Sequence, residues 1–202
     1  VSAYTAFANS GIRTEPLFVS RIEDNEGNVV AEFTPHMEEV ISEESVYKML
    51  IMLRAVINEG TGGRVRRVYN ITADMGGKTG TTNNNSDGWF MGFTPNLVSG
   101  VWVGGEERDI HFDNMRDGQG AEMALPIWGL YMNKVYADKS LGYSQEETFR
   151  IPEDYEGFKE VADFIKRGDV RFFNLETTFP DETCFGHQFY GGAYLRADAR
   201  IL

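Results

Sequence analysis

One stretch, residues 76–104, constrains the fold more than any other part of the chain. It reads GGKTGTTNNNSDGWFMGFTPNLVSGVWVG. A run of small residues opens it, and two apolar runs at 89–93 and 97–103 follow, separated by a Thr-Pro-Asn turn. Apolar runs of this length bounded by turn residues are typical of strands joined by tight connections. The stretch therefore predicts three adjacent antiparallel strands, with a functional edge at the first.

Composition and charge limit what can surround this sheet. The chain has 202 residues, of which 42% are apolar and 13% aromatic. This is enough for one sizeable core, so we expect one domain over residues 1–140 and an acidic, aromatic tail over 141–202. The formal net charge of −12 argues against nucleic acid and anionic membrane surfaces as partners, because both attract basic patches. The single cysteine, Cys184, excludes an internal disulfide.

Four elements are predicted before residue 76. They are a helix end in residues 2–11, a hairpin of residues 17–22 and 29–33, an amphipathic helix capped by Ser42 and ending at 58–60, and a short strand at 68–71. The hairpin prediction rests on β-type runs around a turn-rich segment, and the helix prediction rests on apolar residues at helical spacing. The basic residues just before 68 are expected to form a loop leading into the short strand.

Beyond residue 104 the sequence predicts a loop, a second helix and the tail. Residues 106–120 are polar and are expected to form the long loop. Pro126 fits the first turn of a helix, and apolar residues from Trp128 to Val135 recur at helical spacing. The tail contains one possible short helix at 155–165. The expected fold class is α+β, with an antiparallel sheet and packed helices.

The tripeptide Lys78-Thr79-Gly80, followed by Thr81, carries groups suited to binding a peptide with a free carboxylate. The Lys78 ammonium favours a deprotonated partner beside it. Thr79 and Thr81 point to one face at period two, so both hydroxyls can bond one carboxylate. Gly80 lets an extended peptide lie close to the strand, and the two glycines before Lys78 extend that clearance. The Thr81 N–H supplies half of an oxyanion hole. The bare tripeptide also fits an ordinary surface strand.

The surroundings of the tripeptide resemble one enzyme family. The run KTGTTNNNSDGWFMGFTPNLVSGVWVGGEE is similar to the third active-site motif and following strands of the class A penicillin-binding proteins. The same family is matched, in the same order, by SAYTAFANSG, by RIEDNEGNVV, by the helix before GTG and by ALPIW. The resemblance covers roughly the first 140 residues.

This resemblance implies the C-terminal part of a transpeptidase domain. Such enzymes cross-link D-Ala-D-Ala stem peptides of peptidoglycan through a serine acyl-enzyme, and β-lactams acylate the same serine. Lys78 and Thr81 are then the expected catalytic residues, and Thr79, Gly80 and Thr81 are the expected substrate-binding residues. Neither metal nor cofactor is implied. The family places this domain on the periplasmic or exterior face of the membrane, with a membrane helix and a glycosyltransferase domain upstream of it.

The family's nucleophile motif, Ser-x-x-Lys, and its second motif, Ser-x-Asn, are expected upstream of Val1. A literal Ser-x-x-Lys begins at Ser45 and ends at Lys48. At about 100° per residue, both side chains fall away from the apolar stripe of their helix, toward solvent. The match is also too close in sequence to Lys78. We therefore expect no nucleophile in this chain, and no activity for the chain alone.

Two other functional classes fit the same strand. A binding module could capture peptides on this edge without chemistry. A soluble serine β-lactamase or carboxypeptidase also keeps the tripeptide, although the residues after Thr81 are more similar to the bifunctional synthases.

Two further expectations follow from the rest of the sequence. Cys184 and His187 lack two more ligands at usable spacing, and His36 and His111 are isolated, so we expect no metal site. A sheet without its upstream helices is expected to expose apolar surface, which favours self-association.

Overall fold

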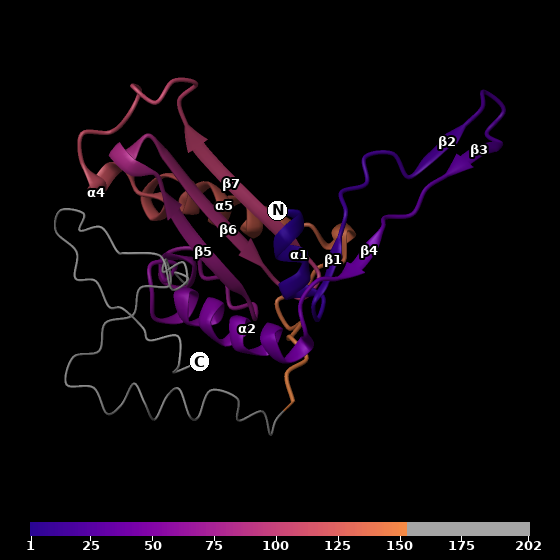
Figure 1. Ribbon diagram of the computed structural model, residues 1–202, viewed down its shortest axis with the longest axis horizontal. Helices are drawn as coiled ribbons and strands as arrows, with labels where there is room; N and C mark the ends of the chain where they lie inside the picture. Colours follow the sequence, from indigo (N-terminus) through magenta and orange to yellow (C-terminus); the bar gives the residue numbers. More distant parts are fainter. Residues whose placement is uncertain (153–202) are drawn as a thin grey trace, which may run out of the picture. The chain divides into compact units, whose positions relative to one another are not determined.

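The computed structural model describes residues 1–152 and shows an α+β fold, as the sequence predicts (Figure 1). In chain order the elements are α1 (Ser2–Ala8), β1 (Ile12–Thr14), β2 (Arg21–Glu23), β3 (Val29–Glu32), β4 (Met37–Glu39), α2 (Glu43–Asn58), α3 (Arg64–Arg67), β5 (Gly76–Thr81), the 3₁₀ turn η1 (Asn83–Asn85), β6 (Asp87–Phe93), β7 (Val98–Gly104), α4 (Met115–Gly118), α5 (Gly120–Ala137) and the 3₁₀ turn η2 (Lys139–Leu141).

The three strands predicted in residues 76–104 form one antiparallel sheet. Their order is β5-β6-β7, so β5 and β7 are its edges within the described residues. The register places Gly80 opposite Trp89, and Trp89 opposite Trp102. The prediction of three adjacent antiparallel strands is therefore confirmed.

One face of this sheet packs on helix α5, which lies behind the sheet in Figure 1. Alternation along β6 turns Gly88, Phe90 and Gly92 toward the helix. The rings of Phe90 and Trp128 lie 5.1 Å apart between centroids. A Cβ on Gly92 would overlap the Trp128 indole, whose Nε1 donates a hydrogen bond of 2.8 Å to Ser99 Oγ. The absence of side chains at the two glycines lets α5 lie directly on the sheet.

The opposite face is covered at one end by α1. Phe93 is fully buried, and its ring lies 6.0 Å from that of Tyr4 and 6.3 Å from that of Phe7. Further along the same face, Trp89 and Trp102 remain 43% and 46% exposed. The uncovered apolar surface that the sequence predicts is therefore present on the described residues, beside strand β5.

Helix α2 forms where the sequence predicts it and packs along β5. The Ser42 hydroxyl accepts a hydrogen bond from the Ser45 N–H at its start. Ser45 itself is exposed, and Lys48 forms an i,i+4 ion pair of 2.8 Å with Glu44. The chance Ser-x-x-Lys match thus lies on the outer surface of α2. The buried stripe consists of Val46, Leu50, Leu53, Val56 and Ile57.

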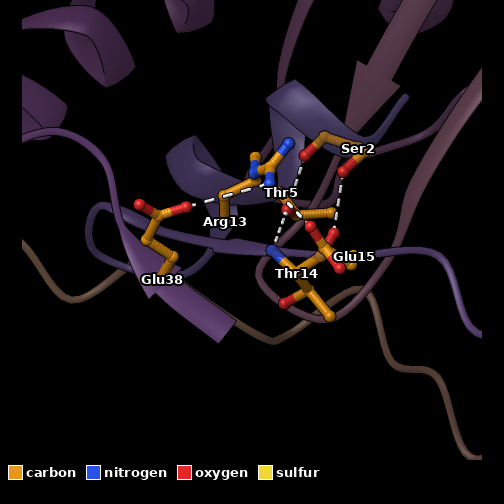
Figure 2. A network of polar contacts seen from close by, with 6 residues as sticks. All are labelled: Ser2, Thr5, Arg13, Thr14, Glu15 and Glu38. Atoms are coloured by element: carbon orange, nitrogen blue, oxygen red, sulfur yellow. Dashed lines mark hydrogen bonds and ion pairs between the residues drawn. The ribbon is translucent and has the colours of Figure 1, made fainter. Parts of the chain in front are cut away.

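The predicted hairpin is confirmed, with shorter strands than expected. Its strands β2 and β3 are antiparallel, with a register shift between Ile22 and Glu23. A second small sheet, in which β1 pairs with β4, was not predicted. Its strands have three residues each and no apolar alternation, so their pairing depends on neighbours (Figure 2). The Thr14 N–H donates 2.8 Å to Thr5 Oγ1, and Ser2 Oγ donates 2.8 Å to the Thr14 carbonyl.

The prediction of a short strand at residues 68–71 is wrong. The chain forms helix α3 at residues 64–67 and then an irregular segment. Arg66 explains the difference, because its guanidinium donates 2.7 Å hydrogen bonds to the carbonyls of Ile71 and Ala73. These carbonyls are bound by a side chain in place of a strand partner, and Ile71 is fully buried.

The predicted start of the last helix is also wrong. Helix α5 begins at Gly120, so Pro126 lies inside it, and the preceding loop is shortened further by the helical turn α4. A Cβ at Gly120 would overlap the carbonyl oxygens of Gly80 and Trp89. The buried residues Ala121, Ala124, Leu125 and Trp128 continue the helical spacing back to the first turn, so placing the start at Pro126 overlooked part of the apolar stripe.

Several expectations concern parts of the chain that the structure does not describe. The possible helix at 155–165, Cys184 and His187 lie outside residues 1–152. The division at residue 141 stays a prediction. Within residues 1–152, no helix has the length and apolar character needed to cross a bilayer, and no group of potential metal ligands gathers.

The contact between Gly92 and Trp128 makes a testable prediction. Gly92→Ala should lower the free energy of unfolding by about 1–3 kcal/mol, because the buried indole cannot move aside. Gly100→Ala in β7 is the matched control and should cost less, since its Cβ would meet the flexible end of Met91. Urea denaturation followed by tryptophan fluorescence measures both values. Equal losses for the two variants would contradict this packing.

Candidate active-site strand

Strand β5 carries all four candidate residues on one edge of the sheet. Its first two residues, Gly76 and Gly77, are buried, and the four residues from Lys78 to Thr81 are partly exposed. A Cβ on Gly77 would lie 2.8 Å from Ile57 of α2. The two glycines thus admit the helix, and the expectation that they provide clearance for a substrate is wrong.

The four candidate side chains alternate between the two faces of the sheet. Thr79 and Thr81 pair with Phe90 and Gly88, which places both threonines on the α5 side. Lys78 pairs with Met91, so its side chain leaves the strand on the opposite side. The structure therefore separates the two hydroxyls from the base of the lysine side chain.

Backbone groups and the end of the Lys78 side chain nevertheless lie together at the outer edge of β5. The Thr82 N–H donates 3.0 Å to the Asp87 carbonyl, across the gap between β5 and β6. Successive peptide groups of a strand point in opposite directions, so the N–H of Thr81 points to the outer edge, and so does the carbonyl of Thr79. Lys78 reaches this edge too, because its Nζ donates 2.9 Å to the Thr79 carbonyl. A cation and an outward N–H thus meet on the outer side of β5, where the described part of the chain provides no strand partner.

Both threonine hydroxyls have neighbours that the sequence analysis missed. Thr79 Oγ1 lies 2.8 Å from Thr61 Oγ1, in the glycine-rich loop after α2. Thr81 Oγ1 accepts a hydrogen bond of 3.0 Å from the N–H of Gly120, at the start of α5. Since that bond occupies a lone pair, the Thr81 hydroxyl keeps its proton for donation. Neither contact has a sequence signal, because the partners lie 18 and 39 positions away.

Gly80 stands at the open part of the strand. A Cβ at this position would approach only Trp89 Cβ, at 3.2 Å, among the described residues. Within residues 1–152, no side chain other than that of Trp89 lies against Gly80 on this face of the strand. An extended peptide could lie along this edge and pair with the outward backbone groups.

The segments on either side of β5 are held by polar contacts. Before the strand, Asp74 forms an ion pair of 2.8 Å with Arg54 and accepts a hydrogen bond of 3.0 Å from the Phe149 N–H. Burial lowers the pKa of the nearby Arg66, and the Asp74 charge acts in the opposite direction. After the strand, Asp87 accepts hydrogen bonds of 3.1 Å from both Thr82 Oγ1 and Trp102 Nε1. These contacts fix β5 at both ends.

Comparison with known proteins agrees with this architecture. Residues 1–107 match the family described as "Penicillin binding protein transpeptidase domain". The chain belongs to the penicillin-binding protein transpeptidase family. Penicillin-binding protein 1A of Aquifex aeolicus (strain VF5) is 42% identical over 134 residues, which cover 66% of this chain and 18% of that protein. Penicillin-binding protein 1A of Neisseria lactamica is 34% identical over 139 residues, which cover 64% of this chain and 16% of that protein.

Solved structures of this transpeptidase family share the fold. Penicillin-binding protein 1A from Haemophilus influenzae aligns with a TM-score of 0.65 at 25% identity, over 77% of this chain and 27% of that one. The D,D-transpeptidase domain of the peptidoglycan glycosyltransferase from Eggerthella lenta aligns with a TM-score of 0.50 at 23% identity, over 67% of this chain and 31% of that one. The chain thus spans less than a fifth of the length of the curated relatives it matches.

The bond between Thr81 and Gly120 gives a prediction within this transpeptidase fold. Thr81→Val should lower the free energy of unfolding by about 1 kcal/mol, because the Gly120 N–H loses its acceptor in a partly buried place. Thr79→Val is the matched control, and it should change stability little, since its contact with Thr61 is exposed. Chemical denaturation of the two variants measures the difference. A larger loss for Thr79→Val would show that the hydroxyl contacts are misassigned.

Proposed function

We propose that this chain supplies the substrate-binding strand of a serine D,D-transpeptidase that cross-links peptidoglycan, and that the nucleophilic serine comes from a segment outside the 202 residues. The supporting observation is the convergence of Lys78 Nζ and the Thr81 N–H on the edge of β5 that has no strand partner among the described residues. Membership of the transpeptidase family supports the reaction type.

In this reaction, the serine oxygen attacks the carbonyl carbon of the penultimate D-Ala of a stem peptide. The amide bond to the terminal D-Ala breaks, and that D-Ala leaves with a proton on its nitrogen. The amine of a neighbouring stem then attacks the ester carbonyl, and the ester bond to the serine oxygen breaks. The amine nitrogen gives up a proton that restores the serine hydroxyl, and the new amide is the cross-link. A β-lactam follows the first step only, through opening of its ring amide.

Each group on the β5 edge has a part in this chemistry. The Thr81 N–H donates to the carbonyl oxygen as negative charge develops on it. The Thr79 and Thr81 hydroxyls donate to the terminal carboxylate, and the bond from Gly120 orients the Thr81 hydroxyl for this. Gly80 leaves room for the stem peptide. Lys78 brings a positive charge to the edge, where it favours the ionised forms of the serine and the carboxylate.

The substrate determines where the reaction takes place. Peptidoglycan lies outside the cytoplasmic membrane, so we infer that the domain faces the periplasm or the cell exterior. By the same family relation, a membrane anchor and a glycosyltransferase domain belong to the intact protein. Stem peptides and β-lactams are the ligands that the β5 edge fits, and none of the steps above needs a metal or cofactor.

The 202-residue chain alone should not react with penicillin. We expect no covalent mass increase by intact-mass spectrometry after incubation with a labelled penicillin, because Ser45 is exposed with its hydroxyl 2.9 Å from that of Ser42, and the ammonium of Lys48 is paired with Glu44. The Ser45→Ala variant should behave identically. Stoichiometric labelling that disappears in Ser45→Ala would overturn the proposal of an external nucleophile.

A chimera tests the role of the strand itself. Residues 1–140 would replace the matching segment of the Aquifex aeolicus relative, and the rate of acylation by a labelled penicillin would be measured. The unsubstituted chimera should be acylated. Lys78→Ala should slow acylation by about a hundredfold or more, the usual scale for losing one electrostatic contact to the transition state.

The matched control for this substitution is Lys48→Ala on the outer surface of α2. It removes the same charge from the lysine of the chance motif, so acylation should continue at the unsubstituted rate. Thermal unfolding of both variants verifies that they fold. A folded Lys78→Ala chimera with unchanged acylation would reject the catalytic role of Lys78.

A further inference from the structure

Residues 15–40, here called the acidic arm, carry a concentration of negative charge. The arm has seven carboxylates and one guanidinium, that of Arg21, so its formal charge is −6. The whole chain has a net charge of −12, which means that half of it lies on 26 of 202 residues. The carboxylates belong to Glu15, Glu23, Asp24, Glu26, Glu32, Glu38 and Glu39.

The same arm exposes large apolar side chains. Phe18 is 94% exposed and Val30 is 66% exposed. Apolar surface on this scale is typical of a binding site, because water otherwise contacts it at a cost. The other exposed apolar residues of the arm are Leu17, Val19, Ile22, Val29, Phe33, Met37 and Val40.

The hairpin within the arm is incomplete as a sheet. Strands β2 and β3 pair only with each other and make no extensive contact with another described helix or strand. Figure 1 shows this hairpin projecting beyond β1 and β4. A two-stranded hairpin is marginally stable alone, and both of its outer edges offer backbone groups to a further strand. Arg21 is ion-paired within the hairpin, to Glu23.

The base of the arm is anchored to the rest of the fold. Figure 2 shows Arg13 between Glu15 and Glu38, at 3.0 and 3.8 Å, so one guanidinium joins both ends of the arm. The hydroxyls of Ser2 and Thr5 bind Thr14 to helix α1. The arm is thus presented from a fixed base.

We propose that the acidic arm is a docking site for an extended segment of a partner protein that carries Lys or Arg among apolar side chains. Such a segment can add to a hairpin edge through its backbone and cover Phe18 and Val30 with apolar side chains. Its cations match the surplus of carboxylates. A second copy of this chain brings another −6 to the same place and is repelled. Nucleic acid and anionic lipid are repelled for the same reason.

The probes for this proposal are three fluorescently labelled octapeptides. They alternate Lys with Val, Lys with Ser, and Glu with Val. The Lys-Val peptide should bind the 202-residue chain about tenfold more tightly than either other peptide, since only it offers both charge and apolar contact. Its affinity should fall as salt is raised. Fluorescence anisotropy at several salt concentrations measures this.

Two sets of variants locate the binding. Phe18→Ser with Val30→Ser should weaken Lys-Val binding about tenfold, and Glu26→Gln with Glu32→Gln and Glu39→Gln should weaken it and reduce its salt dependence. The matched controls change exposed groups elsewhere and should leave binding unchanged. They are Ile127→Ser with Leu130→Ser on α5, and Glu106→Gln with Glu107→Gln after β7.

Other results would overturn the proposal. Equal binding of the three peptides, or binding that no arm substitution changes, would show that the arm is not the docking site. Sedimentation could instead reveal a dimer that Phe18→Ser dissolves, which would make a second copy the occupant. Circular dichroism and thermal unfolding of each variant establish that the fold is intact. None of these measurements depends on transpeptidase activity, so the proposed reaction and the docking site are tested separately.

Discussion

The fold depends on the close approach of helix α5 to strand β6. Two glycines on the inner face of β6 leave room for the helix, and the Trp128 indole lies over Gly92 with its N–H bound to Ser99 of β7. The Trp128 indole thus fills the space that a side chain at position 92 would need. Because protein interiors are closely packed, a larger residue at either position would cost free energy of folding. This contact holds the central strand, and β5 takes its position as an edge strand from the pairing with β6.

The first residues of strand β5 are packed in the core, and its last four residues carry the candidate functional groups. Its first two glycines are buried, with Ile57 of α2 against Gly77, while the residues from Lys78 to Thr81 are partly exposed on an edge that has no strand partner among residues 1–152. A binding group is effective when its support is rigid, because little reorganisation is then needed at the moment of reaction. The buried half of β5 provides this rigidity through the same backbone that carries the outward N–H of Thr81.

Local sequence patterns predicted the elements whose signals are local. The three strands, the hairpin and helix α2 all have apolar runs or caps that mark them within ten or so residues. One error occurred where distant contacts decide. Residues 68–71 have strand-like composition, yet Arg66 binds two of the carbonyls in and after that segment. The start of α5 was predicted too late for a different reason, because Ala121, Ala124 and Leu125 already carry the buried stripe before Pro126.

The candidate site shows the same division. The sequence was enough to suggest binding of a carboxylate, because residue types alone identify the charged and hydroxyl groups. These residues are Lys78, Thr79, Gly80 and Thr81. The positions of these groups relative to one another could not be predicted as fully from the sequence. Alternation predicted that the two threonines share a face, but it also places the base of the Lys78 side chain on the other face. The contact of Lys78 Nζ with the Thr79 carbonyl brings the charge to the edge of the strand. Thr61 and Gly120 contact Thr79 and Thr81 only in the folded chain, and no sequence pattern predicted either contact.

An unpaired strand edge needs protection as well as access. Outward N–H and carbonyl groups invite pairing with any extended chain, and lysine on an edge strand opposes such pairing because two edges would bring like charges together. Lys78 meets this requirement while occupying the Thr79 carbonyl. A peptide with a terminal carboxylate is attracted to this edge instead of repelled, because its negative charge lies near the Lys78 ammonium. The residue proposed to assist the chemistry therefore also selects which extended chain the β5 edge accepts.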